Sequence, residues 1–168
     1  MNAVVGIRRA VLEDAVPLAK LQTLAQTRQD SGWAEVLPWK QWLTDPRFFT
    51  YIAEQSELIG AVAVGSVLDT DLVREDLLDG KPGEILAWFI HPDQWRQKLG
   101  RKLLVHGLTG LKRCLFDSAV IWVPSSAKRA RSVIHELRFG DTGLQRIRNL
   151  PSRSIREHCY KLDLDSYF

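Results

Sequence analysis

The stretch GEILAWFIHPDQWRQKLGRKLL, residues 83–104, is the part of the chain that decides the fold. Its first section, Glu84–Ile90, is almost wholly apolar, which predicts a central strand buried on both faces. The His-Pro-Asp sequence at 91–93 ends this strand, and from Leu99 onward apolar residues recur at helical spacing. The stretch therefore predicts a strand, a short loop and a helix over Arg101–Phe116, whose apolar stripe contains Leu104, Leu108, Leu111 and Leu115.

The loop between this strand and this helix has the properties of an anion-binding site. It carries Arg96, Lys98 and Gly100, and the first N–H groups of the following helix have no acceptor within that helix. Arg and Lys side chains beside such N–H groups strengthen the attraction for phosphate. An ordinary turn with solvated basic side chains is the alternative interpretation.

The rest of the chain predicts strands and helices around this centre. Further strands are expected at Val4–Arg8, Phe48–Ala53, Leu58–Val67, Ala119–Val123, Leu144–Ile147 and His158–Leu164. Further helices are expected from about Glu13, over Trp33–Leu43, and from Ser125 or Ser126 to about Leu137. This order predicts a single α/β domain over residues 1–168, with a mixed central β-sheet flanked by about four helices.

The composition is that of an ordinary globular protein. Of the 168 residues 45% are hydrophobic and 26% are charged, which excludes a disordered chain. The apolar runs fall far short of the ~20 residues of a membrane helix, and the first residues have no signal-peptide layout. The two cysteines are too few for a disulfide framework, and the four histidines form no metal-binding pattern. We therefore expect a cytoplasmic protein without a metal ion and without membrane contact.

The net charge of +3 conceals an uneven distribution along the chain. Residues 1–93 contain 8 Lys and Arg against 14 Asp and Glu, a net charge of −6. Residues 94–156 contain 14 against 3, a net charge of +11, and the last twelve residues contain 1 against 3. Such a surplus favours an anionic partner for the later part: nucleic acid, a phosphorylated ligand or a lipid surface. A solvated basic surface is the alternative.

The order of the expected elements, the opening IRRAVLEDAVPLAKL (residues 7–21) and the sequence HPDQWRQKLGRKLL (91–104) resemble the GCN5-related N-acetyltransferase (GNAT) family. The resemblance covers nearly the whole chain. It implies acetyl-coenzyme A as co-substrate and a Q/R-x-x-G-x-G/A pattern, whose backbone N–H groups hold the pyrophosphate. An alignment without gaps places the leading position of this pattern on Trp95, the first glycine on Lys98 and the second on Gly100.

The resemblance implies coenzyme-binding residues in this loop and at the start of the last long helix: Ile90, Arg96, Gln97, Lys98, Leu99, Gly100, Arg101, Lys102, Lys128 and Arg129. Lysine at position 98 departs from the pattern, because glycine serves where the backbone needs a positive φ or a close approach. Either the charges of Lys98 or Arg96 supplement the lost amide contacts, or coenzyme binding is weakened. The surplus of positive charge favours the first outcome. For Lys128 and Arg129 a solvated basic face is the alternative.

Glu84 is the catalytic residue that the resemblance implies. It is the one ionisable residue in the apolar strand, and in several family members a glutamate at this position acts as general base, usually through water. Burial beside Ile85 and Trp88 raises the pKa of a carboxyl group toward the range useful for deprotonating an ammonium. The alternative is that Glu84 only begins the strand in an exposed position.

The general acid is not assigned by the sequence. Many family members carry a tyrosine in the last long helix, shortly before a Gly-Phe pair. Matching Phe139 to that pair places Ile134 at the tyrosine and Arg138 at the glycine. Ile134 cannot transfer a proton, and His135 points about 100° away on a helix. Tyr160, from the last expected strand, is a further candidate.

The leading hypothesis is an acyl-coenzyme A-dependent N-acyltransferase that transfers an acetyl group to a primary amine by direct attack in a ternary complex. The acceptor would be a small-molecule, peptide or protein amine, drawn by an acidic connection that contains Asp69, Asp71, Glu75, Asp76 and Asp79. One alternative is a catalytically degenerate relative that binds the coenzyme or a partner without turnover. The other is a nucleic-acid-related role with tRNA as acceptor. The acceptor, the acyl length and the oligomeric state, a homodimer included, stay open.

Overall fold

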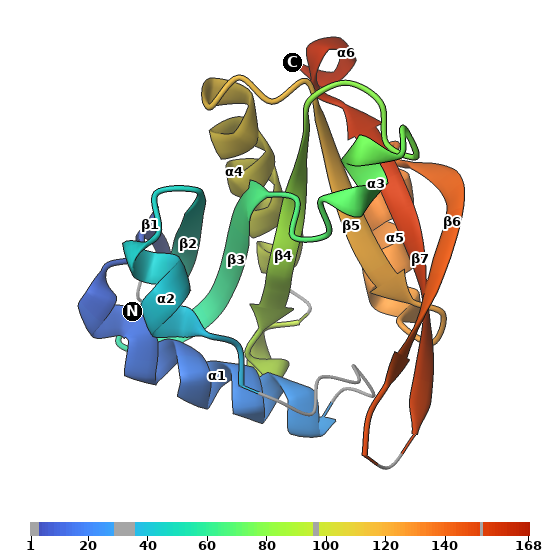
Figure 1. Ribbon diagram of the computed structural model, residues 1–168. Coiled ribbons are helices and arrows are strands. Elements are labelled where there is room, and N and C mark those ends of the chain that lie inside the picture. Colours follow the sequence, from blue (N-terminus) through green and yellow to red (C-terminus); the bar gives the residue numbers. More distant parts are fainter. Residues whose placement is uncertain (1–3, 29–35, 96–97, 152) are drawn as a thin grey trace.

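A seven-stranded mixed sheet forms the centre of the protein in a computed structural model that describes residues 4–28, 36–95, 98–151 and 153–168 (Figure 1). The strand order is β1-β2-β3-β4-β5-β7-β6. Neighbouring strands are antiparallel except for β4 and β5, which run parallel. The strands are β1 (Gly6–Arg9), β2 (Phe48–Glu54), β3 (Leu58–Ser66), β4 (Pro82–Ile90), β5 (Ser118–Pro124), β6 (Gly140–Asn149) and β7 (Ser154–Asp163).

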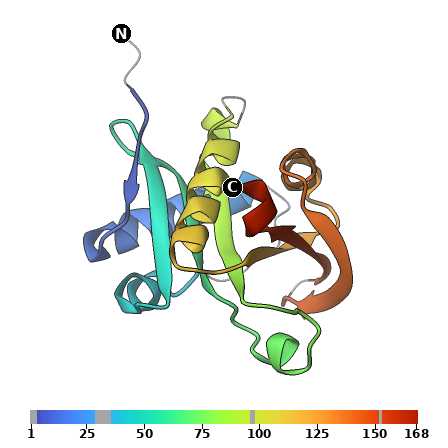
Figure 2. The same cartoon turned by 90° about the horizontal axis from the view of Figure 1, so that it is seen from above.

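Helices cover both faces of this sheet (Figures 1 and 2). They are α1 (Ala15–Arg28), α2 (Trp39–Thr44), α3 (Asp71–Arg74), α4 (Leu99–Arg113), α5 (Lys128–Glu136) and α6 (Leu164–Tyr167). The first three lie on one face, here called the α1 face, while α4 and α5 lie on the other, the α4 face. The α/β class with a mixed sheet is confirmed, and the short helices α3 and α6 are additional to the four expected ones.

The alternation of side chains along the strands builds an apolar core on each side of the sheet. On the α4 face, Leu104, Leu108 and Leu111 of α4 are fully buried against Val62 and Val64 of β3. On the α1 face, the two helices α1 and α2 pack over the strands through a cluster that includes Leu18, Trp39, Trp42, Phe48, Ile52 and Leu86. Burial of such side chains is the main favourable contribution to folding.

The parallel strands β4 and β5 separate part of the way along their length, as Figure 1 shows. Their pairing runs only from Pro82–Ile85 to Ser118–Ile121, although β4 continues to Ile90. On the other side of β4 the register with β3 shifts at Ala63/Val64, so that Leu86 is an extra residue of β4. A bulge of this kind bends a strand and turns its side chains. The fold therefore opens its sheet immediately beyond Glu84 and Ile85.

Several expected boundaries are wrong, and each has a local cause. Helix α2 begins at Trp39, because the residue before Pro38 is disfavoured in helical conformation; Trp33 lies outside the described residues. Helix α4 begins at Leu99 and ends at Arg113. Leu115 therefore does not continue the apolar stripe: it has φ 65° and is 77% exposed.

The last two strands are longer than expected and form one hairpin. Strand β6 covers Gly140–Asn149 rather than residues 144–147, and β7 begins at Ser154 rather than His158. Leu164 is the first residue of α6, whose N-terminus is capped by the Asp163 carboxylate through the N–H groups of Asp165 and Ser166. The polar residues at the start of each strand hid these extensions, because one face of the hairpin is largely exposed.

Candidate functional site

Glu84 is buried on β4, so the alternative of an exposed position is wrong. The residue is 5% exposed, and one carboxylate oxygen accepts a hydrogen bond from the N–H of Leu68 at 2.9 Å. Burial raises the pKa of Glu84 above its usual value, as do the charges of Asp69 and Glu157, while the Leu68 N–H and the charge of Arg146 oppose the rise. The shift favours the protonated form of this carboxyl group and makes its carboxylate form a stronger base.

Glu84 lies next to the point where β4 and β5 separate. Glu84 pairs with Val120, and the next pair, Ile85 with Ile121, is the last before the two strands part. Ile85 belongs to the core on the α4 face, and the neighbouring Glu84 therefore points to the α1 face. A buried carboxyl group thus lies on one face of the sheet, at the apex of an opening between two strands.

Lys98 has the backbone conformation that favours glycine. It precedes α4 with φ 55° and ψ 14°, in the left-handed region. The resemblance aligns this position with a glycine, and the backbone of Lys98 has a conformation that favours glycine. Gly100, by contrast, is not required by packing, since a Cβ there would meet Trp88 Cζ2 at an ordinary 3.4 Å.

Basic side chains from two helices gather near this loop. The Arg129 guanidinium of α5 lies 4.3 Å above the ring of Trp95, and the Trp95 indole N–H donates to the carbonyl of Ile90 at 3.2 Å. Lys128 is exposed beside Arg129, and Lys98 is exposed at the start of α4. The starts of α4 and α5 therefore share one basic surface, here called the basic edge: Lys98, Lys128 and Arg129.

The remaining expected coenzyme residues lie in different environments. Leu99 and Ile90 are buried, and the Gly100 carbonyl accepts from the Trp88 indole N–H at 2.9 Å. Lys102 is exposed, and exposed Arg101 lies 3.9 Å from Glu136. Arg96 and Gln97 lie outside the described residues.

Helix α5, for which the resemblance implies a tyrosine, offers no proton donor at the aligned position 134. Ile134 is fully buried in the core. Arg138 has φ 67° and ends α5, where its N–H donates to His135 and the Phe139 N–H donates to Ile134. The exposed His135 contacts the ring edge of Tyr160, which is buried on the α4 face. The structure thus brings the two other candidates together but assigns the acid to neither.

The acidic connection before β4 is partly neutralised by other side chains. Asp79 forms an ion pair with Lys161, and Asp71 lies 3.4 Å from Arg74. Asp69 follows Leu68, the residue that donates to Glu84. Of the five acidic residues proposed to attract an amine, Asp69 has the most direct electrostatic effect on Glu84.

A buried ion cluster on the same face was not predicted from the sequence. Glu157 of β7 is fully buried, and its carboxylate accepts from Arg146 Nε at 2.9 Å and lies 3.5 Å from Arg148 Nη2. The signal was the alternation Ile155, Glu157, Cys159, which places Glu157 on a buried face. Cys159 also faces this cluster, where burial raises the pKa of its thiol to about 11, so it is a poor nucleophile.

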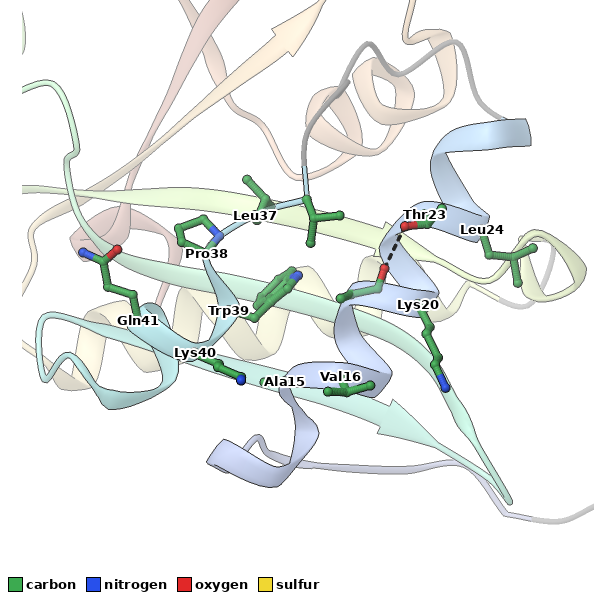
Figure 3. Close-up of a pocket in the computed structure, with 12 residues that line it drawn as sticks. Ala15, Val16, Lys20, Thr23, Leu24, Leu37, Pro38, Trp39, Lys40 and Gln41 are labelled. Atoms are coloured by element: carbon green, nitrogen blue, oxygen red, sulfur yellow. Dashed lines mark hydrogen bonds between the residues drawn. The ribbon is translucent and has the colours of Figure 1, made fainter.

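A separate apolar groove of about 920 Å³ lies between α1 and residues 36–41 (Figure 3). Its walls include Val16, Leu24 and Val36, and Lys20 and Lys40 stand at its border. Neither Glu84 nor the basic edge lines it. Among the described residues no helix is long and apolar enough to cross a membrane, and no group of three His, Cys, Asp or Glu side chains is placed to hold a metal ion.

Comparison with known proteins identifies the family of this chain. The model of the acetyltransferase (GNAT) family matches residues 14–138, and the chain belongs to this family. No curated protein matches its sequence.

Three of the solved structures that share the fold come from bacteria. One is the ribosomal-protein-S18-alanine N-acetyltransferase of Escherichia coli, with 17% identity, a TM-score of 0.71 and coverage of 96% of this chain and 94% of that one. Another is yncA of Salmonella typhimurium with its cofactor acetyl-CoA, with 20% identity, a TM-score of 0.77 and coverage of 97% and 95%. The third is an N-acetyltransferase of Staphylococcus aureus Mu50, with 15% identity, a TM-score of 0.78 and coverage of 96% and 99%.

Proposed function

We propose that this protein transfers an acetyl group from acetyl-coenzyme A to a primary amine, with Glu84 as the general base. The observation that carries the proposal is the position of Glu84: a buried carboxyl group at the apex of the opening between β4 and β5. Membership of the acetyltransferase family supports the choice of co-substrate.

The coenzyme has a complementary surface along this opening. Beyond Ile85 the edge of β4 that faces β5 has no paired strand in the described register, and its backbone groups suit an extended chain with amide bonds, such as pantetheine. The phosphates would lie at the N-terminus of α4, where N–H groups and the basic edge favour anions.

Glu84 would act on the acceptor by removing a proton from its ammonium group, directly or through one water molecule. The free amine then attacks the thioester carbon and a C–N bond forms. The C–S bond breaks, the nitrogen releases its extra proton, and the sulfur leaves as a thiolate that takes up one proton to give free coenzyme A. The burial that raises the pKa of Glu84 also makes the carboxylate a stronger base than an exposed one. The high pKa of the Cys159 thiol argues against an acetylated cysteine on this face and for direct attack.

Two measurements test this proposal. Calorimetry with acetyl-coenzyme A tests binding, and release of free thiol in the presence of a panel of amines tests transfer. We expect E84Q to bind the coenzyme like the wild type and to lose 10²–10⁴-fold in turnover, the usual contribution of a general base. The matched control is E57Q, in the exposed turn between β2 and β3, which should keep full activity. Binding without turnover of any amine would instead favour a degenerate, coenzyme-binding relative.

A further inference from the structure

In the cluster of Arg146, Arg148 and Glu157, the Arg146 guanidinium is held by more than its ion pair with Glu157. Glu157 is fully buried and fixes Arg146 through a hydrogen bond from Nε at 2.9 Å. The Arg146 guanidinium also lies 4.3 Å over the ring of Trp122, so two contacts hold it in one orientation. Within the part of the chain that the structure describes, the Nη groups of Arg146 have no hydrogen-bond partner.

This cluster lies on the face of the sheet to which Glu84 points. Trp122, Val120 and Cys159 contribute to one apolar cluster there, and Val120 is the residue of β5 that pairs with Glu84. Trp122 lies on β5, two residues beyond Val120, the partner of Glu84. The strand spacing and the rise per residue therefore place the Cα atoms of Trp122 and Glu84 on the order of 8 Å apart. The Arg146 guanidinium over Trp122 is therefore within the reach of a small molecule whose other end contacts Glu84.

Acidic and basic side chains lie at opposite ends of this face of the sheet. At one end stand Glu84 and Asp69, which attract an ammonium group. At the other stand the guanidinium groups of Arg146 and Arg148, which lie 2.9 and 3.5 Å from the Glu157 carboxylate. An arginine with a fixed orientation and free Nη donors matches a carboxylate, which accepts two parallel hydrogen bonds. The cationic end is therefore complementary to a carboxylate and the acidic end to an amine.

We infer that the acceptor is an amine that also carries a carboxylate, as in a free amino acid, and that Arg146, completed by Arg148, binds that carboxylate. This inference rests on the proposed acetyl transfer and adds the substrate class. Glu157 is then a positioning residue, since it acts only by orienting the two arginines.

The test compares free amino acids with their carboxamides, which keep the shape and the amine but lose the negative charge. With acetyl-coenzyme A as donor, we expect the wild type to prefer the acids by at least tenfold in kcat/KM. R146Q should lower kcat/KM for the acids 10–100-fold, mostly through KM, and leave the amides unchanged. R148Q should have a smaller effect in the same direction. The matched control is R156Q, because Arg156 is exposed, bonds to Gln145 and lies one residue from Glu157 on the opposite face.

A second readout does not depend on turnover. N-acetylated amino acids, the expected products, should raise the melting temperature of the wild type and of R156Q but not of R146Q. If no amine is acetylated while this shift is seen, the proposed reaction fails and the carboxylate site stands. Equal turnover of acids and amides by the wild type, with R146Q unaffected, would overturn the inference, and so would the absence of both turnover and the shift. A preference for phosphoethanolamine over ethanolamine, without one for acids over amides, would replace the carboxylate by a phosphate and also overturn it.

Discussion

Two positions that the resemblance aligns with glycine carry long basic residues in this protein. Lys98 and Arg138 have φ values of 55° and 67°, in the left-handed region that glycine enters without strain. Both positions therefore combine a backbone conformation that favours glycine with a long side chain. At position 98 the side chain adds a positive charge at the start of α4, where the coenzyme phosphates are expected.

Replacing Lys98 by glycine should stabilise the protein. The left-handed conformation costs about 1–2 kcal/mol in a residue with a side chain, and part of this gain is lost to the greater freedom of glycine in the unfolded chain. We expect K98G to raise the free energy of unfolding by about 0.5–1 kcal/mol, measured by urea denaturation. The control is K102G, within the helical part of α4, which should lower it by about 1 kcal/mol. Equal destabilisation by both variants would contradict the assigned backbone conformation.

At this scale the sequence predicted Glu84 and Lys98 but not the Glu157 cluster. Glu84 stands out because it is a single charge in an apolar strand, which is a local property. The partnership of Glu157 with Arg146 and Arg148 depends on which strands are neighbours and in what register. That information is not contained in a short window of sequence.

The elements that we propose to form the coenzyme site are the starts of α4 and α5, joined by the contact of Arg129 with Trp95. The double variant K128Q/R129Q should raise the Kd for coenzyme A about tenfold, because two positive charges near the phosphates are removed. The effect should shrink at high salt. The control is R113Q, at the opposite end of α4, which should leave the Kd unchanged. Calorimetry at two salt concentrations makes the comparison, and equal effects of both variants would remove the basic edge from the site.

The long elements were predictable because their apolar patterns are local, and their ends were not. The stripe of α4 indicated a helix, but the turn at Leu115 that ends it is set by two hydrogen bonds, from Leu115 to Lys112 and from Phe116 to Leu111. These bonds form the usual helix-terminating motif without its glycine. The separation of β4 and β5, on which the proposed site depends, is a relation between two strands. It could not be predicted from the sequence of either strand alone.

The stability of the whole molecule depends on the close approach of α4 to the sheet. A Cβ at Gly110 would come within 2.5 Å of Phe49 Cε2 and 2.9 Å of the Tyr51 hydroxyl, so this glycine lets the helix lie close to β2. G110A should lower the free energy of unfolding by about 1 kcal/mol, because an overpacking penalty of about 1–3 kcal/mol exceeds the gain in helix propensity. The control G6A has open space around its added Cβ and should be close to neutral. Thermal or urea unfolding measures both, and a stabilised G110A would show that α4 does not press on β2.

The central claim for the whole molecule is that Glu84, at the opening of the sheet, removes the proton of the acceptor. Only the carboxylate form of Glu84 can do so, and burial shifts its pKa upward, so the rate should rise with pH through a midpoint above the ordinary value of 4.5. The measurement is the pH dependence of kcat/KM for amine-dependent thiol release, for the wild type and E84Q. We predict that E84Q is slower by 10²-fold or more and has lost the acidic limb of the wild-type profile. An E84Q enzyme with wild-type rate and the same acidic limb would contradict the account.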